Sequence, residues 1–372
     1  MTEGKAILEA RALKRHFTSK GQFFGAQTVV RAVDGVDLAI EEGETFAIVG
    51  ESGCGKSTLA RLLVRLIEPS AGQVMYGGAD IGGLAEADLR KLRAEMQFIF
   101  QDPFSSLNPR MTVGALIEEP LRTHGIGTAE TRRATVAQFL SRVGLRPEHA
   151  DRYPHEFSGG QRQRIGIARA LVTGPKVLIG DEPVSALDVS IQAQIINILE
   201  DLKEEFGLTL IVIAHDLAVI RHMSDRVAVM YLGQIVETGP IDRLFEAPAH
   251  PYTEALLAAI PIASVGARKA HVAVEGDPPD PISPPSGCRF HTRCAYAQAQ
   301  CRSEAPTLRD LGDGRQAACH FIGALGLTGI RGDATDRSET ARKRFDVYGA
   351  ARAAQETKTN LSNTEETTHA NR

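Results

Sequence analysis

The chain has 372 residues, of which 43% are hydrophobic, and a formal net charge of −4 at pH 7. This composition is typical of a globular protein with a buried core, and the small negative charge gives no bulk electrostatic reason to expect nucleic acid or an anionic membrane as a partner. The N-terminus lacks the apolar core of a signal peptide and no apolar run approaches the roughly 18 residues that span a bilayer, so we expect a cytoplasmic protein that would need other subunits to cross a membrane.

The first elements in chain order are strands that lead into a glycine-rich loop. Residues 7–17 and 33–40 alternate apolar and polar side chains, as half-buried strands do. A third strand at 45–49 runs directly into the loop, and 57–67 is expected to form the helix after it. A strand, a glycine loop and a helix in this order are the context that a phosphate-binding P-loop requires. The loop consists of Gly50, Glu51, Ser52, Gly53, Cys54, Gly55, Lys56 and Ser57, followed by Thr58.

The middle of the chain interrupts the strand pattern. Residues 96–100 predict another strand, whereas residues 111–153 are polar, rich in Arg and helical in period. We interpret this region as part of a helical subdomain, at about 103–172, inserted into the nucleotide-binding core. Downstream the elements alternate, with helices at 161–172 and 191–206 and strands at 177–180, 208–214 and 227–231. This alternation predicts an α/β fold with a mainly parallel sheet and helices on both faces.

The last part of the chain changes composition twice. Five prolines between positions 278 and 285 mark a boundary or a stiff linker. The segment after them carries four of the five cysteines, and beyond about residue 331 the chain is too polar to bury a core. We therefore predict a nucleotide-binding domain at 1–260, a small, loop-rich, Cys-rich module at 261–325 and a disordered polar tail at 326–372.

The P-loop indicates a nucleoside triphosphate and Mg²⁺ as ligands. Its glycines let backbone N–H groups surround the phosphates, and the helix that follows presents its positive end to them. We expect Lys56 to reach the β- and γ-phosphates and the Ser57 hydroxyl to bind Mg²⁺. Cys54 is expected to be a loop residue accepted for its size rather than a nucleophile. An eight-residue match taken alone leaves open a plain glycine turn before a helix.

Two carboxylates follow the apolar strand at 177–180. Asp181 is placed to hold Mg²⁺, directly or through water. Glu182, next to it, is the candidate for orienting the attacking water and accepting its proton. The alternative is a surface Asp-Glu pair after a core strand, which is a common arrangement.

A third segment, residues 157–161 with the sequence Phe-Ser-Gly-Gly-Gln, lies between the P-loop and these carboxylates. Together with Pro183 and the loop at 185–188, this order of segments resembles the ABC ATPase family, whose members close as dimers around two ATP molecules. The resemblance implies a P-loop NTPase core with an antiparallel β subdomain and an inserted helical subdomain. It also implies that the loop ending at Asp188 contacts the partner subunit.

The same resemblance assigns roles to three further residues. His215 follows an apolar strand and resembles the switch histidine that hydrogen-bonds the γ-phosphate of ATP. Gln101 resembles the glutamine that binds the metal, senses the attacking water and connects both to the membrane subunits. Phe17 resembles the aromatic residue that stacks on adenine, a role for which Phe23 and Phe24 compete.

Residues 158–161 point to a second nucleotide. Ser158 and the backbone of Gly159 and Gly160 lie at the start of a predicted helix, and a helix N-terminus with small residues is a good anion site. The P-loop already binds the phosphates of one nucleotide, so the resemblance implies that this end, with Gln161 and Asp188, contacts ATP on the partner's P-loop. The alternative is a Ser-capped helix after a loop, which would explain Ser158 but not both glycines and Gln161.

Three segments narrow the resemblance to the peptide branch of bacterial importers, namely residues 101–110, 152–164 and 250–261. The resemblance covers roughly residues 7–321 and implies the ATPase subunit of a dipeptide or oligopeptide importer. The implied partners are a related but distinct ATPase, two transmembrane permease subunits and an extracytoplasmic substrate-binding protein, with no nucleic acid. Relatives that import nickel, opines or glutathione leave the cargo open.

Two other classes of function compete with transport. ABC proteins that act on DNA separate the P-loop from the acidic strand by a long coiled coil, and those that act on ribosomes carry two ATPase modules; this chain has neither feature. The second class is a non-hydrolysing regulatory subunit, and the presence of Glu182, His215 and Ser158 counts against it.

The late cysteines are separated by gaps of five, six and seventeen residues. This spacing is not the paired Cys-x-x-Cys pattern of ordinary zinc ribbons, although clustered cysteines in a cytoplasmic chain favour a metal or a cluster over disulfides. Four thiolates suffice for an iron–sulfur cluster, and similar segments in the peptide branch suggest a [4Fe–4S] centre. A Zn²⁺ site completed by His291 and His320, and reduced thiols without a ligand, are the alternatives. The cysteines are Cys288, Cys294, Cys301 and Cys319.

Overall fold

The computed structural model describes residues 6–19, 28–102, 106–185, 187–214, 217–260 and 276–330. Residues Met1–Ile260 and Val272–Gly329 belong to one compact unit, and Pro261–His271 with Ile330–Arg372 to a second one. All the elements below lie in the first unit, whereas the second contains a single described residue, Ile330. The tail predicted at 326–372 therefore lies outside the described residues from position 331 on. None of the helices in the described ranges is long and apolar enough to cross a membrane.

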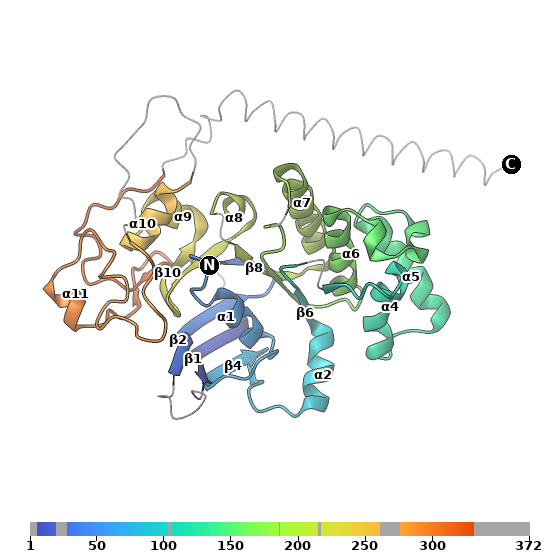
Figure 1. Cartoon of the computed structure of the whole chain (residues 1–372), viewed down its shortest axis with the longest axis horizontal. Coiled ribbons are helices and arrows are strands. Elements are labelled where there is room, and N and C mark those ends of the chain that lie inside the picture. Colours follow the sequence, from blue (N-terminus) through green and yellow to red (C-terminus); the bar gives the residue numbers. More distant parts are fainter. Residues whose placement is uncertain are drawn as a thin grey trace, which may run out of the picture. The chain divides into compact units, whose positions relative to one another are not determined.

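A parallel sheet forms the centre of the first unit (Figure 1). Its strands are β3 (Thr45–Val49), β6 (Met96–Ile99), β7 (Val177–Asp181), β8 (Thr209–Ala214) and β9 (Arg226–Tyr231). β3 pairs in parallel with both β8 and β9, and β7 pairs in parallel with β8 and β6. Every residue of β3, β7 and β8 is buried, as expected for strands covered on both faces. The predicted α/β fold with a mainly parallel sheet is confirmed.

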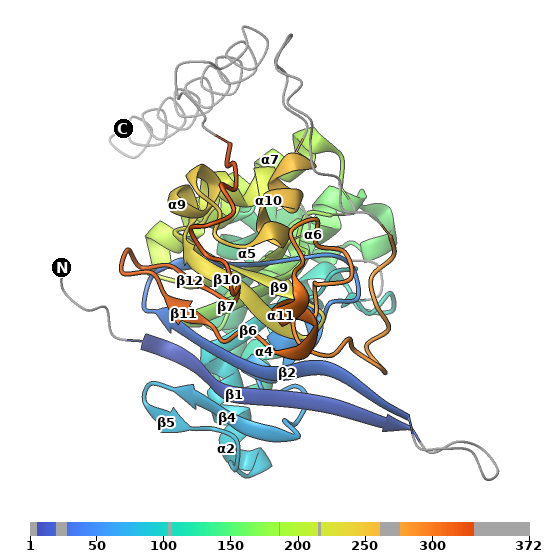
Figure 2. The ribbon, with the colours of Figure 1, turned by 90° about the vertical axis from the view of Figure 1, so that its left-hand side faces the viewer.

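A second sheet is antiparallel and occupies the lower part of Figure 2. Its strands, in the order β2-β1-β4-β5, are β1 (Ala6–Ser19), β2 (Thr28–Glu41), β4 (Ala71–Tyr76) and β5 (Ala79–Asp80). Buried residues of this sheet, including Leu8, Leu13 and Ile40, share one core with β3 and with helix α1 (Lys56–Leu63). This sheet is the antiparallel β subdomain that the sequence resemblance implies.

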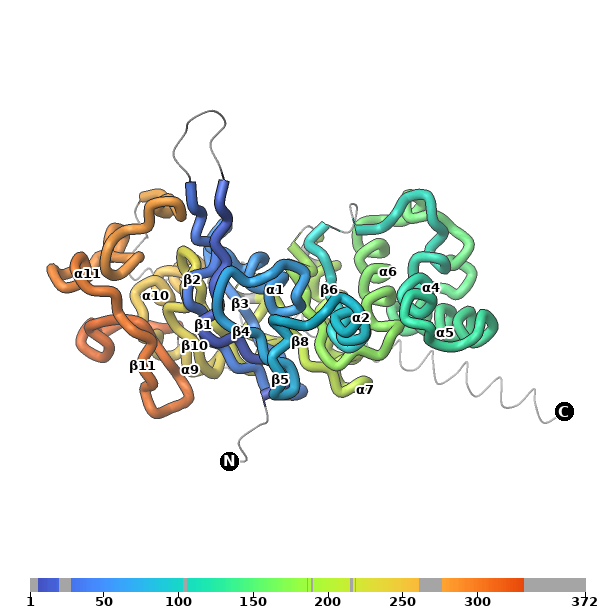
Figure 3. The backbone as a smooth tube through the Cα atoms, turned by 90° about the horizontal axis from the view of Figure 1, so that it is seen from below, coloured from blue at the N-terminus to red at the C-terminus, as the bar shows by residue number. Residues whose placement is uncertain are grey.

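A group of helices lies beside the β6 and β7 edge of the main sheet (Figure 3). The helices are α4 (Val113–Thr123), α5 (Ala129–Arg142) and α6 (Gly159–Leu171), with 3₁₀ turns at Pro147–Asp151 and Pro154–Glu156. Leu116, Ile117 and Leu121 share the buried face of α4, at helical spacing. They join a second core that includes Leu178 of β7 and Leu210 of β8. The region predicted as helical is therefore helical, while its boundaries at about 103 and 172 stay a prediction.

Two helix ends show why the sequence predicted one boundary correctly and missed another. α7 (Val189–Phe206) stops at Gly207, which takes the left-handed conformation with φ 63°, so the predicted stop is confirmed. The predicted helix at 57–67 instead ends at Leu63. The cause is Arg65, which has φ 53° and whose Nε donates a hydrogen bond to the carbonyl of Ile81.

Several elements were not predicted, among them β4 and β5 of the antiparallel sheet. β10 (Gln234–Pro240) follows β9 through a two-residue turn at Leu232 and Gly233, both with positive φ. β12 (Gln316–Ala317) pairs with β10, so the segment after the prolines continues the main sheet, in the order β11-β12-β10-β9-β3-β8-β7-β6. The others are α2 (Glu86–Glu95), α8 (Leu217–Met223), α9 (Ile241–Glu246), α10 (Pro251–Ala258), α11 (Ala299–Ser303) and β11 (Arg309–Asp310).

Candidate functional site

The P-loop joins the buried strand β3 to helix α1, as the sequence predicts. Two of its glycines are required by close backbone contacts. Gly50 has φ 152°, and a Cβ there would lie 2.1 Å from the carbonyl oxygen of Met230. Gly55 has φ 108°, and a Cβ there would lie 2.0 Å from the carbonyl oxygen of Ala32. The loop therefore passes so close to its neighbours that only glycine fits at these two positions.

Lys56 crosses the inside of the loop. Its Nζ donates hydrogen bonds to the carbonyl oxygens of Gly50 at 2.8 Å and Glu51 at 2.9 Å, and the side chain is buried. Cys54 is buried against this ammonium, with 4.0 Å between Sγ and Nζ. Burial raises the pKa of the Cys54 thiol, which is what a packed loop residue rather than a nucleophile would show.

Ser57 and Asp181 bring the P-loop and the end of β7 together. The Ser57 hydroxyl donates a 2.8 Å hydrogen bond to Oδ1 of Asp181. Asp181 is 1% exposed, and its Oδ2 makes no hydrogen bond with any described residue; the guanidinium of Arg61 lies 3.9 Å away. Burial raises the pKa of Asp181, opposed by Ser57 and Arg61. A buried carboxylate oxygen without a hydrogen bond needs another partner, and together with the Ser57 hydroxyl it forms an oxygen donor set that suits Mg²⁺.

Gln101 and Glu182 meet at the same edge of the sheet. Nε2 of Gln101 donates a 3.0 Å hydrogen bond to Oε2 of Glu182, although β6 and β7 supply them from distant parts of the chain. The backbone of Glu182 is held by β8, because its N–H donates to the carbonyl of Ile213 at 3.0 Å. Its φ of 48° is uncommon for a residue with a side chain and indicates a conformation imposed by the surroundings.

Lys56, Ser57, Gln101 and Glu182 share one cleft of about 210 Å³. It is lined by P-loop residues and by both Gln101 and Glu182, as the sequence predicts. Six lining residues were not predicted: Val30, Arg31 and Ala32 of β2, Leu232 and Gly233 of the turn before β10, and Pro281 of the proline-rich stretch. The complete lining is Val30, Arg31, Ala32, Ser52, Gly53, Cys54, Gly55, Lys56, Ser57, Thr58, Gln101, Glu182, Leu232, Gly233 and Pro281.

Of the residues predicted to stack on adenine or to act as the switch histidine, the structure describes only Phe17. Phe17 is 39% exposed on β1, under the guanidinium of Arg15, and is not among the residues that line the cleft. Its strand partner Val30 does line the cleft. Phe23, Phe24 and His215 lie outside the described residues, so their roles stay predictions.

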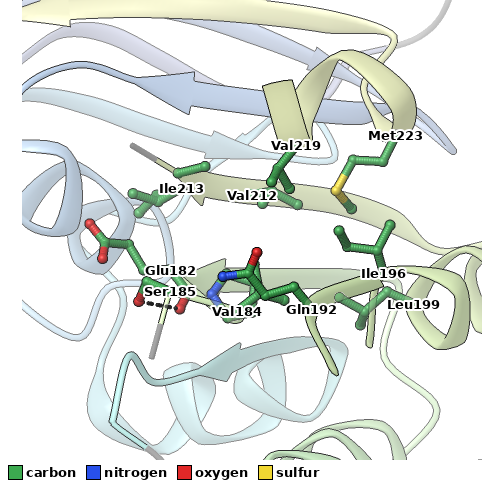
Figure 4. Close-up of a pocket in the computed structure, with 12 residues that line it drawn as sticks. Glu182, Val184, Ser185, Gln192, Ile196, Leu199, Val212, Ile213, Val219 and Met223 are labelled. Atoms are coloured by element: carbon green, nitrogen blue, oxygen red, sulfur yellow. Dashed lines mark hydrogen bonds between the residues drawn. The ribbon is translucent and has the colours of Figure 1, made fainter. Parts of the chain in front are cut away.

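A smaller pocket of about 40 Å³ lies on the other side of Glu182 (Figure 4). Apolar side chains from α7, β8 and α8 line it, among them Leu199, Val212 and Met223, and the Glu182 carboxylate points away from them. In the turn that follows β7, the Ser185 hydroxyl donates a 3.2 Å hydrogen bond to the carbonyl oxygen of Glu182. An apolar lining of this kind suits side-chain packing rather than a nucleotide.

Three of the predicted signature residues at the start of α6 have structural reasons to be there. Ser158 and Gln161 form a reciprocal capping box, with distances of 3.1 and 3.3 Å. A Cβ on Gly160 would lie 2.5 Å from Cγ2 of Ile191 on α7. Gly159 has no such neighbour, because a Cβ there would reach only Leu187 at 3.7 Å. Helix capping and packing therefore account for more of this segment than the sequence suggested.

The exposed end of α6 is separate from the cleft. Ser158 is exposed, as is Asp188 at the start of α7. Ser158, Gly159, Gly160, Gln161 and Asp188 are all absent from the described lining of the cleft. In this chain they do not join the P-loop in one site.

The four late cysteines line one further cavity, together with His250, His291 and His320. All four are free thiols. Burial, together with smaller contributions from the neighbouring thiols, raises the pKa of Cys288 and of Cys294 to about 11. Within the described ranges, no group of three or more Cys, His, Asp or Glu side chains is arranged to hold a metal ion. Four cysteine thiols are the right kind and number of ligands for an iron–sulfur cluster, but in this structure they are not arranged as a metal site.

Comparison with known proteins places these features in a family. Residues 33–185 match the ABC transporter family, and residues 236–301 match the oligopeptide/dipeptide transporter C-terminal region. The chain is 52% identical over 316 residues to the probable peptide ABC transporter ATP-binding protein y4tS of Sinorhizobium fredii, covering 85% of this chain and 90% of that protein. It is 50% identical over 321 residues to the oligopeptide transport ATP-binding protein AppF of Bacillus subtilis, covering 85% and 98%.

Solved structures agree with this placement. The dimeric, post-hydrolysis structure of the ATP-binding cassette MJ0796 bound to ADP and Pi has 30% sequence identity and a TM-score of 0.57. The similarity covers 63% of this chain and 98% of that cassette. An ATPase of this kind requires a P-loop with carboxylates beside it; here Glu182 lines the cleft with the P-loop, and Asp181 is hydrogen-bonded to Ser57. The chain belongs to the ABC transporter ATP-binding proteins, in the branch that carries the oligopeptide/dipeptide transporter C-terminal region.

Proposed function

We propose that this chain hydrolyses ATP to energise an importer of dipeptides or oligopeptides at the cytoplasmic face of the cell membrane. The observation that carries the proposal is the meeting of two pairs, Ser57 with Asp181 and Gln101 with Glu182, beside the P-loop. The peptide cargo is supported by the C-terminal region and by relatives named for peptide transport.

The P-loop residues Gly50 to Thr58 would bind the phosphates of ATP, with Lys56 contributing the positive charge. Ser57, Asp181 and Gln101 would hold Mg²⁺, which neutralises charge on the β- and γ-phosphates when bound. Glu182 would orient a water molecule and accept its proton as the water oxygen bonds to the γ-phosphorus. The bond between that phosphorus and the bridging oxygen breaks, and ADP and phosphate leave.

Two residues complete the proposed site. His215 would donate a hydrogen bond to the γ-phosphate, following the family resemblance. Phe17 would stack on adenine, which its exposed ring beside the cleft-lining Val30 supports. Phe23 and Phe24 remain competitors for this second role.

The exposed start of α6 would serve ATP bound to a second subunit. Ser158, with Gly159, Gly160 and Gln161, would contact its γ-phosphate, and Asp188 would lie at the same interface. This idea is supported by the separation of these residues from their own cleft and by the dimeric state of the similar cassette. We infer a related, distinct ATPase as the partner, with two permease subunits and an extracytoplasmic binding protein.

The four cysteines would hold a [4Fe–4S] cluster with a structural or sensory role, since ATP hydrolysis needs no electrons. Their convergence on one cavity supports this assignment. A Zn²⁺ site with His291 and His320 is the alternative: one ring nitrogen of each contacts a backbone carbonyl, at 2.8 and 2.9 Å, and the other ring nitrogen would bind the metal. Oxygen-free purification with a visible spectrum and iron and zinc analyses distinguishes the cluster, zinc and free thiols.

Reconstitution tests the transport proposal. The chain is assembled in lipid vesicles with a related ATPase subunit, two permease subunits and a binding protein, and ATP hydrolysis is measured with candidate cargoes. Stimulation by dipeptides or oligopeptides is expected. Stimulation by Ni²⁺, an opine or glutathione alone would overturn the peptide assignment and keep the ATPase, whereas absence of hydrolysis in the complete assembly would overturn both. Stimulation only by DNA or ribosomes would overturn transport.

A further inference from the structure

Arg293 connects the P-loop to the cysteine-bearing segment. Its guanidinium donates hydrogen bonds to both carboxylate oxygens of Glu51, at 2.8 and 3.0 Å. The Arg293 side chain is only 7% exposed and that of Glu51 28%. A bidentate pair of this kind fixes the relative orientation of its two groups, and shielding from water makes its loss costly.

The backbone of Glu51 is held from the same side. Its N–H donates a 2.8 Å hydrogen bond to the hydroxyl of Tyr252, while its carbonyl accepts from Lys56. The ring of Tyr252 packs against Tyr231 and Phe290, with centroids 4.7 and 5.3 Å away. Glu51 therefore lies between the phosphate-binding lysine and a set of buried residues that the P-loop itself does not supply.

A second arginine of the same segment reaches another part of the cleft. Arg289 donates to the carbonyl oxygen of Leu232 and to the carboxylate of Asp34 on β2. Leu232 lines the cleft. The Arg289 side chain is 10% exposed and that of Asp34 13%. Two largely buried arginine side chains thus hold the P-loop, at Glu51, and one wall of the cleft, at Leu232.

Each of these arginines stands next to a cysteine. Cys288 precedes Arg289, and Cys294 follows Arg293. Both cysteines line the four-cysteine cavity, and the N–H of Cys288 donates to the carbonyl of Cys301 at 2.8 Å. Residues 288–294 therefore line the four-cysteine cavity, with Cys288 and Cys294 at their two ends. The same segment contacts the P-loop through Arg293 and the wall of the cleft through Arg289.

We propose that residues 288–294 form a clamp, in which Arg293 is a positioning residue that holds the P-loop through Glu51. Through this contact, a change in how the four-cysteine cavity packs alters the affinity of the P-loop for nucleotide. The inference rests on the proposed function in that the cleft binds ATP. It assigns Arg293 no contact with the nucleotide.

Arg293→Gln tests the first half of the clamp. Binding of a fluorescent ATP analogue with Mg²⁺ is expected to weaken roughly 3- to 30-fold, as for residues that act through another group. KM for ATP should rise by a similar factor while kcat changes less. Arg302→Gln, an exposed arginine of the same segment, is the matched control. Unchanged nucleotide affinity in a folded Arg293→Gln variant would overturn the proposal.

A double-mutant cycle shows whether Arg293 acts through Glu51. Arg293→Gln combined with Glu51→Gln should be no worse than the weaker-binding single variant, because both changes remove the same contact. If the losses of nucleotide-binding free energy in the two single variants simply added, Arg293 would not act through Glu51. Arg293→Lys keeps the charge but loses the bidentate geometry, and it serves if Arg293→Gln does not fold.

Cys294→Ser tests the link to the four-cysteine cavity. It should weaken nucleotide binding, and the loss should not add to that of Arg293→Gln. Unchanged affinity in Cys294→Ser would overturn the link. Hydrogen exchange of the amides at 50–57 without nucleotide gives a readout that does not need ATP binding. Faster exchange in Arg293→Gln supports the clamp, and unchanged exchange contradicts it. A wild-type protein that binds no ATP would overturn the proposed function but not the clamp.

Discussion

The amide of Gln101 donates a 3.0 Å hydrogen bond to the carboxylate of Glu182, although 81 positions separate the two residues. The bond forms because β6 and β7 are parallel neighbours whose carboxyl ends meet at one edge of the sheet. Ser57 of α1, which the P-loop joins to β3, meets Asp181 of β7 at the same edge. The proposed proton acceptor and the proposed metal-binding oxygens therefore lie side by side because of strand order and the path of the P-loop, and four predictions follow from this and related contacts.

Glu182→Gln should lower ATP turnover by roughly 10²–10⁴-fold while leaving nucleotide binding intact. The amide keeps the size of the side chain and an oxygen that can accept the hydrogen bond from Gln101, but it cannot accept a proton from water. Phosphate release and binding of a fluorescent ATP analogue are measured on the same preparation, and ATP-bound dimers should accumulate. Glu68→Gln, at an exposed position, is the control. Turnover equal to that of the wild type would remove Glu182 as the base.

Asp181→Asn should separate metal binding from folding. The unpartnered Oδ2 and the raised pKa show that the buried carboxylate is held at a cost, so the amide should not lower the free energy of unfolding in the absence of ligands. With MgATP at 100 times its Kd the wild type should gain about 2.7 kcal/mol, and the variant should lose most of this gain. Thermal unfolding with ATP, with and without Mg²⁺, measures both. A variant stabilised by MgATP as strongly as the wild type would show that Asp181 does not bind the metal.

The two glycines of the α6 start should respond in opposite ways to alanine. Gly159→Ala should keep or raise the stability of the isolated chain, because the new methyl group meets only Leu187 at 3.7 Å and alanine favours helix by about 1 kcal/mol. Gly160→Ala should cost about 1–3 kcal/mol, since its methyl group would overlap Ile191. Denaturant unfolding measures both.

The same pair tests the contact with a second nucleotide. Gly159→Ala should weaken ATP-dependent dimerisation of the Glu182→Gln protein, measured by gel filtration, because its backbone would face the partner's γ-phosphate. Dimerisation at wild-type strength would leave this segment with a structural role only.

Glu237 should make stability depend on pH. It is fully buried on β10, where its carboxylate accepts N–H bonds from Ala249 and His250 at 2.8 and 2.9 Å. Burial raises the pKa of Glu237 from 4.5 to about 7, although these bonds oppose the shift. A raised carboxyl pKa gives stability that is fully present below pH 4.5 and is lost as the pH rises to about 7. The change is at most about 3 kcal/mol.

Glu237→Gln should remove this part of the pH dependence. The variant is expected to be less stable at every pH, because glutamine offers one acceptor oxygen where the carboxylate offers two. The informative quantity is therefore the difference in unfolding free energy between variant and wild type, followed from pH 4.5 to 8. A difference that does not change with pH would show that Glu237 keeps its ordinary pKa.

Local patterns were enough to identify the P-loop and seven of the strands, β1, β2, β3 and β6 to β9. The run at 45–49 is apolar because β3 is covered on both faces, and Gly207 marks the end of α7 through its left-handed conformation. The two-residue turn at Leu232 and Gly233 carries a comparable local signal, and attention to it would have found β10. Short strands such as β12 have too few residues to show any periodicity.

The start of α6 shows where reasoning from the sequence overreached. The sequence suggests that Gln161 and both glycines exceed what a capped helix needs. In the structure Gln161 completes the capping box and Gly160 makes room for Ile191, a residue 31 positions away by the printed numbering. Packing between α6 and α7 decides the second point, and no pattern within 157–161 could show it.

By itself the sequence determined the α/β fold, the P-loop, the carboxylate pair and membership of the ABC family, because each depends on residues that are close together in the chain or follow in a recognisable order. Only the tertiary structure decided that Gln101 bonds to Glu182 and that Arg293 holds Glu51 from 242 positions away. Such contacts are set by strand order and by the path of the chain after the prolines, which carries Arg293 back to the P-loop and extends the main sheet through β12. A short motif specifies its own backbone, whereas its partners depend on how distant segments pack.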